Sequence, residues 1–281
     1  TAYQPRGSMN ETSSTFKQYD ADVFLGTDNL QLADGVSLTA FVGVGTTNEK
    51  YEAYGVSGSD FIVPFLLNVK NTKNQGSSYS EWEKQINSAY GSAEIGFMDY
   101  AYLTVTARND WFSTLSLKNK KAPNNDLYTS ASLSLVLSDA LDLGDTISFM
   151  KLRAGYSQVA GGADSPYALS LSYGIYGQGH LGASLGNISG GTIPNSEITP
   201  FEKNETEFGM DLRLFDNKLS IDATMYDNET LGDIVGVSAS ATSGYGSALA
   251  NLGNISNKGI ELLVKGEIMR TADFAWEASV N

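Results

Sequence analysis

Few residues of this chain could carry out chemistry. Among its 281 residues there is no cysteine and a single histidine, His180. The lack of cysteine excludes disulfides, thiolate nucleophiles and cysteine-based zinc sites, and one histidine cannot form a multi-histidine metal site. A Ser-His-Asp triad would have to use His180, which lies in the glycine-rich stretch Gly177–His180. We therefore expect neither a catalytic centre nor a cofactor.

Carboxylates are the remaining candidates for catalysis or metal binding. Glu205 and Glu207 could form a glycosidase pair, but they alternate with apolar residues and so share one face of a strand. A polar wall explains them better. Asp139, Asp142 and Asp145 lack the ligand spacing of an EF-hand, which favours a solvated turn over a calcium site. No metal site is predicted.

Charge and hydropathy narrow the class of protein further. The chain has 18 Lys and Arg against 32 Asp and Glu, a formal net charge of −14. This balance argues against nucleic acid as a partner and against docking on an anionic membrane surface. Hydrophobic residues make up 41% of the chain, yet no run approaches the roughly 20 apolar residues of a membrane helix. The protein is therefore either soluble or a membrane β-barrel.

Alternation of apolar and polar residues with period two is the dominant pattern, as in Leu219–Tyr226. It predicts ten strands, most of them about as long as the ~9–11 residues of a tilted membrane strand. One short helix, Glu81–Ala89, is predicted inside a loop. The predicted strands cover residues 16–26, 36–52, 86–98, 101–109, 127–137, 147–157, 205–214, 218–228, 258–268 and 273–281.

The connections between these strands alternate between short and long. Tight turns are expected at 99–100 and 215–217, whereas the long connections cover residues 53–85, 110–126, 158–204 and 229–257. Successive connections of an antiparallel meander lie at opposite ends of the sheet. Short periplasmic turns and long extracellular loops are typical of outer-membrane barrels. The predicted fold is therefore all-β, a transmembrane antiparallel up-and-down β-barrel.

The long loops hold the residues that we expect to touch a substrate or a partner. Aromatic side chains on polar loops can stack on sugar rings or on peptide side chains, although many merely pack the loop. The candidates are Trp82, Trp111, Tyr167, Tyr173, Tyr176, His180 and Tyr245. Arg108 and Asp110 leave a predicted strand together, and an ion pair between them is expected to pin the loop that follows.

Three segments resemble a known family. Residues 102–115 (YLTVTARNDWFSTL), 147–161 (ISFMKLRAGYSQVAG) and 251–262 (NLGNISNKGIEL) are similar to segments of the SusC/RagA family of TonB-linked outer-membrane proteins. Residues 200–214 resemble a fourth segment, and the order and spacing also agree. Ala107 replaces the usual Gly and Phe112 a usual Ser. The resemblance covers most of residues 86–281, whereas residues 1–85 fit by pattern only.

The resemblance implies both a fold and a function. Residues 1–281 would form one part of a single barrel domain, about ten strands of a probable 22-stranded barrel, with the plug and the N-terminal extension absent. The protein would import large nutrients, either glycan oligosaccharides or peptides, across the bacterial outer membrane. Its partners would be a SusD-like surface lipoprotein acting as a lid, TonB acting through the plug, and outer-membrane lipid. The family also suggests a dimer of transporter–lid pairs.

Two other functions stay open from the residues alone. A small, complete ten-stranded barrel could be an outer-membrane protease, which would need His180 beside paired carboxylates at the barrel mouth. A soluble, secreted β-sandwich could bind carbohydrate, and then the apolar face formed by Leu219, Ile221, Ala223 and Met225 would be a buried core.

Overall fold

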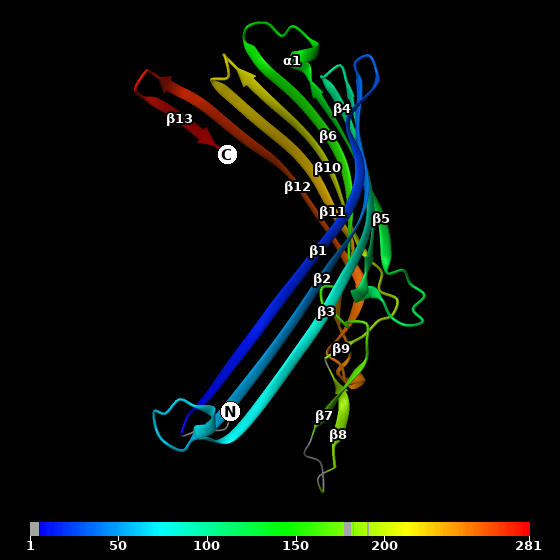
Figure 1. The fold of residues 1–281 in the computed structure, drawn as a ribbon, viewed down its shortest axis with the longest axis vertical. Helices are drawn as coiled ribbons and strands as arrows, with labels where there is room; N and C mark the ends of the chain where they lie inside the picture. Colours follow the sequence, from blue (N-terminus) through cyan, green and yellow to red (C-terminus); the bar gives the residue numbers. More distant parts are fainter. Residues whose placement is uncertain (1–5, 177–180, 182, 190) are drawn as a thin grey trace. The chain divides into compact units, whose positions relative to one another are not determined.

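The computed structural model describes residues 6–176, 181, 183–189 and 191–281, and most of them lie in β-strands (Figure 1). Within these ranges, short helical turns interrupt the strands at η1 (Val69–Asn71), η2 (Ser113–Leu115), α1 (Leu137–Ala140) and η4 (Ala241–Ser243). No helix in these ranges is long and apolar enough to cross a membrane. The strands are β1 (Ser8–Ala33), β2 (Val36–Phe61), β3 (Thr72–Phe97), β4 (Ala101–Phe112), β5 (Asn125–Val136), β6 (Ile147–Gly161), β7 (Ser172–Tyr176), β8 (Leu185–Ser189), β9 (Thr192–Ile193), β10 (Phe201–Leu214), β11 (Leu219–Ser238), β12 (Ser247–Arg270) and β13 (Ala275–Val280).

The main sheet follows the order β1-β2-β3-β4-β5-β6-β10-β11-β12-β13. Neighbours in the sheet are neighbours in the chain, apart from the excursion between β6 and β10. Within that excursion β7 and β8 form a separate hairpin, and β9 pairs in parallel with the start of β12. This meander confirms the predicted fold class, and its edges within the described residues are β1 and β13.

All ten predicted strands exist, but several of their boundaries were wrong. β1, β2 and β3 each have 26 residues, so the expected loop 53–85 shrinks to residues 62–71. The predicted helix Glu81–Ala89 is also wrong, because these residues lie in β3. Both faces of this part of β3 carry polar or aromatic residues, so the apolar–polar contrast on which the prediction relied is missing. The expected loop 229–257 likewise shrinks to residues 239–246.

Two compact units share the long strands. One contains residues 1–21 and 46–86, and its sheet consists of residues 8–21 of β1, 46–61 of β2 and 72–86 of β3; we call it the distal blade. The other contains residues 22–45 and 87–281, and we call it the wall. The predicted tight turns of the wall are confirmed. Met98 and Asp99 adopt positive φ at one turn, and Phe215, Asp216 and Asn217 do so at the other.

The two faces of the wall differ in chemistry. Directly opposite residues of neighbouring strands share a face, so Phe208, which faces Met225 across β10 and β11, belongs to an apolar face. That face is open to the surroundings, with exposures of 59% for Phe208, 55% for Met225 and 73% for Ile260. The apolar face comprises Leu103, Val105, Ala131, Leu133, Leu152, Ala154, Phe208, Met210, Ile221, Ala223, Met225, Ile260 and Leu262.

A soluble sandwich would have to bury this apolar face. Only six apolar residues of the described chain are buried, and none belongs to the face that includes Ile221, Ala223 and Met225. Soluble monomers rarely expose such a large continuous apolar surface. The face is therefore a lipid-facing belt, and the soluble sandwich is excluded.

Candidate functional site

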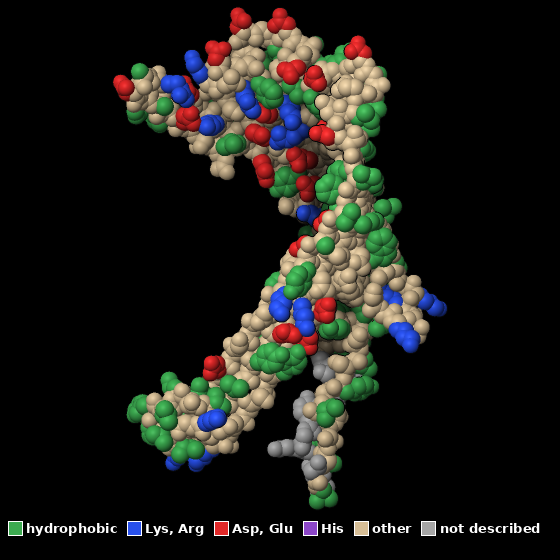
Figure 2. Space-filling model, in the orientation of Figure 1, with side chains coloured by type: hydrophobic (Ala, Val, Ile, Leu, Met, Phe, Trp, Pro, Cys, Tyr) green, Lys and Arg blue, Asp and Glu red, His purple; other side chains and the backbone are tan. Residues whose placement is uncertain are grey.

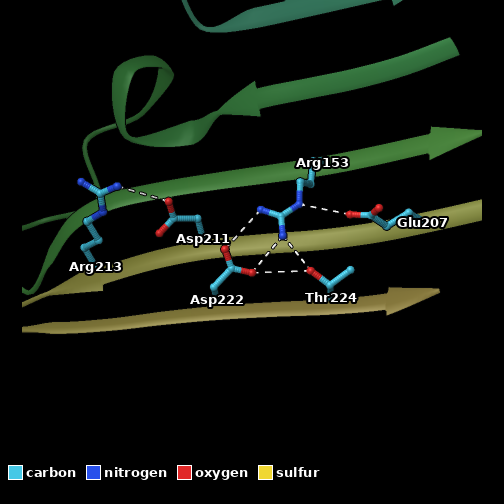
Figure 3. Close-up of polar contacts among 6 residues, drawn as sticks. All are labelled: Arg153, Glu207, Asp211, Arg213, Asp222 and Thr224. Carbon is cyan, nitrogen blue, oxygen red and sulfur yellow. Dashed lines mark hydrogen bonds and ion pairs between the residues drawn. The ribbon is translucent and has the colours of Figure 1, made fainter. Parts of the chain in front are cut away.

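Charged side chains of both signs gather on the opposite face of the wall, over β6, β10 and β11 (Figure 2). The centre of this group is Arg153 of β6, whose guanidinium extends across β10 to β11 (Figure 3). Its Nη2 donates to Asp222 Oδ1 at 2.9 Å and to Thr224 Oγ1 at 2.7 Å. Its Nε lies 3.5 Å from Glu207 Oε1. Glu207, considered above for catalysis, is thus part of a polar wall that links three strands.

Gly209 makes this arrangement possible. It lies directly between Arg153 on β6 and Thr224 on β11. A Cβ on Gly209 would lie 2.2 Å from Arg153 Nε and 2.7 Å from its Cγ. The arginine therefore lies over the backbone of β10 because the central strand has no side chain at that position.

We expect Gly209→Ala to destabilise the wall by about 1–3 kcal/mol, because the new methyl group overlaps the arginine stem. Gly155→Ala is the matched control on the same face, since its Cβ would meet nothing closer than 3.8 Å. That substitution should be neutral or stabilise by about 0.4–1 kcal/mol. Denaturant unfolding of the reconstituted protein measures both. Equal losses for the two variants would show that Arg153 does not depend on Gly209.

A second polar network joins three strands of the wall, β3, β4 and β5. Asp110 at the end of β4 is 6% exposed and accepts hydrogen bonds from Arg108 Nε at 2.8 Å and from the Tyr128 hydroxyl at 2.6 Å. Arg108 also donates to Ser88 Oγ at 2.8 Å and lies over the ring of Tyr90, 5.4 Å from its centroid. The predicted Arg108–Asp110 ion pair is thus confirmed, and it connects β4 with both of its neighbours.

Beyond this network, at the same end of the wall, lie the connection between β4 and β5 and the longest connection, between β6 and β10. Their described residues form what we call the ordered base. The small core there contains Phe112 from the end of β4, Leu115 from the β4–β5 connection, and Leu169 and Ile198 from the longest connection, all buried. The two connections meet where Gly162 lies against Phe112 and Thr114, since a Cβ on Gly162 would be 2.9 Å from Thr114 Oγ1.

Polar contacts fasten the ordered base as well. The amide of Asn251 donates to the carbonyl oxygens of Thr199 and Gly232 at 3.0 and 2.7 Å, and its oxygen accepts from the Thr199 N–H at 3.0 Å. Lys120 Nζ donates to the carbonyl oxygen of Leu115 at 2.9 Å. Burial of this ammonium group lowers the pKa of Lys120 below its ordinary value.

The predicted contact residues of the wall do not form one cluster. Tyr167 and Tyr173 are exposed, Trp111 lies at the end of β4, and Tyr245 is half-buried between β11 and β12. Within the described part of the chain, no ring contact joins any two of these four. Tyr176 ends β7; its side chain, like all of His180, lies outside the described residues.

Trp82 differs from the other candidates because it lies in a strand of the distal blade. Its ring stacks on Tyr51, with centroids 5.6 Å apart and planes at 17°, and the centroid of the Phe16 ring lies 6.2 Å from that of Trp82. Sequence reasoning missed Tyr51 and Phe16. A signal was available in the period-two spacing, which places Glu49 and Tyr51 on one face of a strand and Trp82 and Lys84 on one face of another.

The described residues contain no group of three or more histidines and carboxylates that could hold a metal ion. Asp110, Glu207 and Asp222 of the two networks are engaged with arginine or with the Tyr128 hydroxyl. The site is therefore a polar surface opposite a lipid belt, with an ordered loop base at one end and tight turns at the other. Such a surface can line a water-filled passage and contact a solute.

Comparisons with known proteins agree with this architecture. The family model described as TonB dependent receptor-like, beta-barrel matches residues 1–281. TonB-dependent receptor P3 of Formosa agariphila is 25% identical over 292 residues, which cover 99% of this chain and 27% of that protein. TonB-dependent receptor P26 of the same organism is 25% identical over 249 residues, covering 86% of this chain and 24% of that protein.

Solved structures show the same fold. The RagAB peptide transporter superposes with a TM-score of 0.83 at 19% sequence identity, over 97% of this chain and 30% of that chain. The copper transporter OprC superposes with a TM-score of 0.56 at 15% identity, over 95% of this chain and 37% of that chain. The chain thus spans about a quarter to a third of the length of the proteins that it matches.

Proposed function

The chain belongs to the TonB-dependent receptor-like β-barrel family of the bacterial outer membrane, and we propose that it forms part of the wall of a TonB-dependent importer of large nutrients. The observation that supports this most is the division of the sheet into a lipid-facing belt and a charged opposite face. An apolar belt holds such a wall in the bilayer, and a polar face lines an aqueous passage. Members of this family are not enzymes, so the protease considered above is set aside.

In this proposal the cargo is a glycan oligosaccharide or a peptide too large for passive porins. RagAB, a peptide transporter, is only 19% identical to this chain, so its cargo does not decide between glycan and peptide here. A SusD-like lipoprotein would act as the lid, and TonB would act through a plug that is not among residues 1–281. Two transporter–lid pairs would assemble as a dimer.

The orientation in the membrane belongs to the same proposal. The turns at Met98–Asp99 and Phe215–Asn217 would face the periplasm, and the ordered base around Leu115 and Ile198 would face outward. The candidates Trp111, Tyr167, Tyr173, Tyr176, His180 and Tyr245 would then lie on the extracellular side, where lid and cargo arrive. Residues 1–281 would form one segment of a single barrel domain.

Uptake by intact cells tests the function directly. Cells that carry or lack the full-length receptor are given fluorescent oligosaccharides and oligopeptides above the porin size limit. We expect periplasmic fluorescence from one of the two classes only when both the receptor and TonB are present. Receptor-dependent entry that persists without TonB, or no receptor-dependent entry of either class, would contradict the proposal.

A further inference from the structure

Three aromatic rings from three neighbouring strands form a continuous surface on the distal blade. Tyr51 of β2 and Trp82 of β3 are stacked, and Phe16 of β1 adjoins Trp82 at a centroid distance of 6.2 Å and an interplanar angle of 54°. We call Phe16, Tyr51 and Trp82 the aromatic platform. Phe16 is more than half exposed and the other two rings are partly exposed, so the rings are open to a ligand.

The charged groups beside the platform already have partners within the blade. Lys84 Nζ lies 3.1 Å from Glu49 Oε2 and 5.9 Å from the centroid of the Trp82 ring. Asp20 accepts hydrogen bonds from Gln18 at 2.8 Å and from the Thr47 hydroxyl at 2.7 Å. Because Lys84, the cation beside the rings, is already paired with Glu49, this rim is poorly suited to an anionic ligand. Its carboxylate, amide and hydroxyl groups instead suit the hydroxyl groups of a neutral ligand.

The other face of the blade shows that these residues lie in water rather than in lipid. Along β2 the even-numbered residues change from apolar, ending at Val44, to polar at Asn48, Lys50 and Glu52. Lys50 Nζ lies 2.9 Å from Glu52 and 3.0 Å from Glu81, and these carboxylates raise the pKa of Lys50. A 26-residue strand is about 85 Å long, whereas the hydrocarbon core is about 30 Å thick. The outer half of β2 therefore extends beyond the membrane.

We propose that the aromatic platform binds a neutral oligosaccharide, which it holds by stacking sugar rings on Trp82 and Tyr51. The C–H groups on the flat side of a sugar carry partial positive charge and meet the negative face of an aromatic ring. Asp20, Glu49 and Gln18 lie beside the rings and accept or donate hydrogen bonds at the sugar hydroxyls. This assignment rests on the proposed function, which places the blade on the extracellular side. It narrows the cargo from a glycan or a peptide to a glycan.

Binding to the full-length receptor, purified in detergent, tests this inference. The probes are linear neutral hexasaccharides of glucose, mannose and xylose and an uncharged hexapeptide, each titrated by calorimetry. We expect at least one hexasaccharide to bind, and Trp82→Ala to weaken its affinity by about tenfold or more, the loss expected for stacking together with buried ring area. Trp82→Phe should retain part of the affinity.

Tyr79→Ala is the matched control, since Tyr79 is exposed and packs on Tyr54 on the opposite face of the same strands, with centroids 4.9 Å apart. It should leave the affinity unchanged, and heat-modifiable mobility on gels verifies the fold of each variant. No binding of any hexasaccharide, equal losses for Trp82→Ala and Tyr79→Ala, or Trp82-dependent binding of the hexapeptide alone would overturn the assignment. Because binding here needs neither TonB nor a lid, sugar binding without import would refute the importer and leave the platform standing.

Discussion

Met225→Arg is expected to lower the free energy of unfolding in a bilayer by about 2–4 kcal/mol, the cost of an arginine on the lipid face near the midplane. Met225 lies on the lipid-facing belt, opposite Phe208 on β10 and Ile260 on β12. Counted from the turn at Phe215–Asn217, it is near the middle of the ~9–11 residues that a tilted strand needs to cross the membrane. Guanidinium titration of the receptor reconstituted in vesicles measures the loss.

The matched control places the same charge at a similar depth on the other face. Ser132 of β5 pairs with Thr104 and Gly155, and it belongs to the polar face that carries Arg153. Ser132→Arg should change the free energy of unfolding by no more than about 0.5 kcal/mol, the usual range for a solvated surface position. If the two arginines cost the same, the assignment of lipid and water to the two faces is wrong.

The sequence predicted the wall far better than the distal blade, and lipid is the physical reason. Where one face of a strand meets lipid and the other meets water, side chains must alternate in polarity, and residues 218–228 show this clearly. In the blade both faces carry charged side chains. Lys50 and Glu81 lie on one face and Glu49 and Lys84 on the other, so no contrast marks the strand. The helix predicted at 81–89 followed from that loss of signal.

The contact residues were predicted less well because their placement depends on long-range packing. Period-two spacing can place Glu205 and Glu207 on one face of a strand, but only the register across β10 shows that Gly209 lets Arg153 reach Thr224 on β11. Similarly, Trp82 was identified as an aromatic on a supposed loop, whereas its partners come from strands that begin more than 30 residues earlier in the chain. The ordered base carried no local signal, since buried Leu115 and Ile198 each stand between polar neighbours in the sequence.

Leu115→Ala is expected to release this base. Leu115 is fully buried, and removing such a side chain typically costs about 2–5 kcal/mol. The lost stability should make local opening of the connections easier, because the strands of the wall are held by their own backbone hydrogen bonds. Buried Leu169 and Ile198 come from the long connection, and Gly162 lies against Thr114 next to Leu115, so opening one connection exposes the other. Limited proteolysis of the folded receptor should cleave residues 162–200 at least about tenfold faster, since each 1.4 kcal/mol of opening free energy changes the open population tenfold.

Leu117→Ala provides the comparison, because Leu117 lies two residues away in the same connection and is exposed. It should change the cleavage rate by less than about threefold, the equivalent of roughly 0.5 kcal/mol. Denaturant unfolding of the whole wall should be nearly the same for both variants, which separates local release from global destabilisation. Equal cleavage rates for the two variants would show that residues 162–200 are held independently of Leu115, by the contacts of Asn251 and the β9–β12 pairing alone.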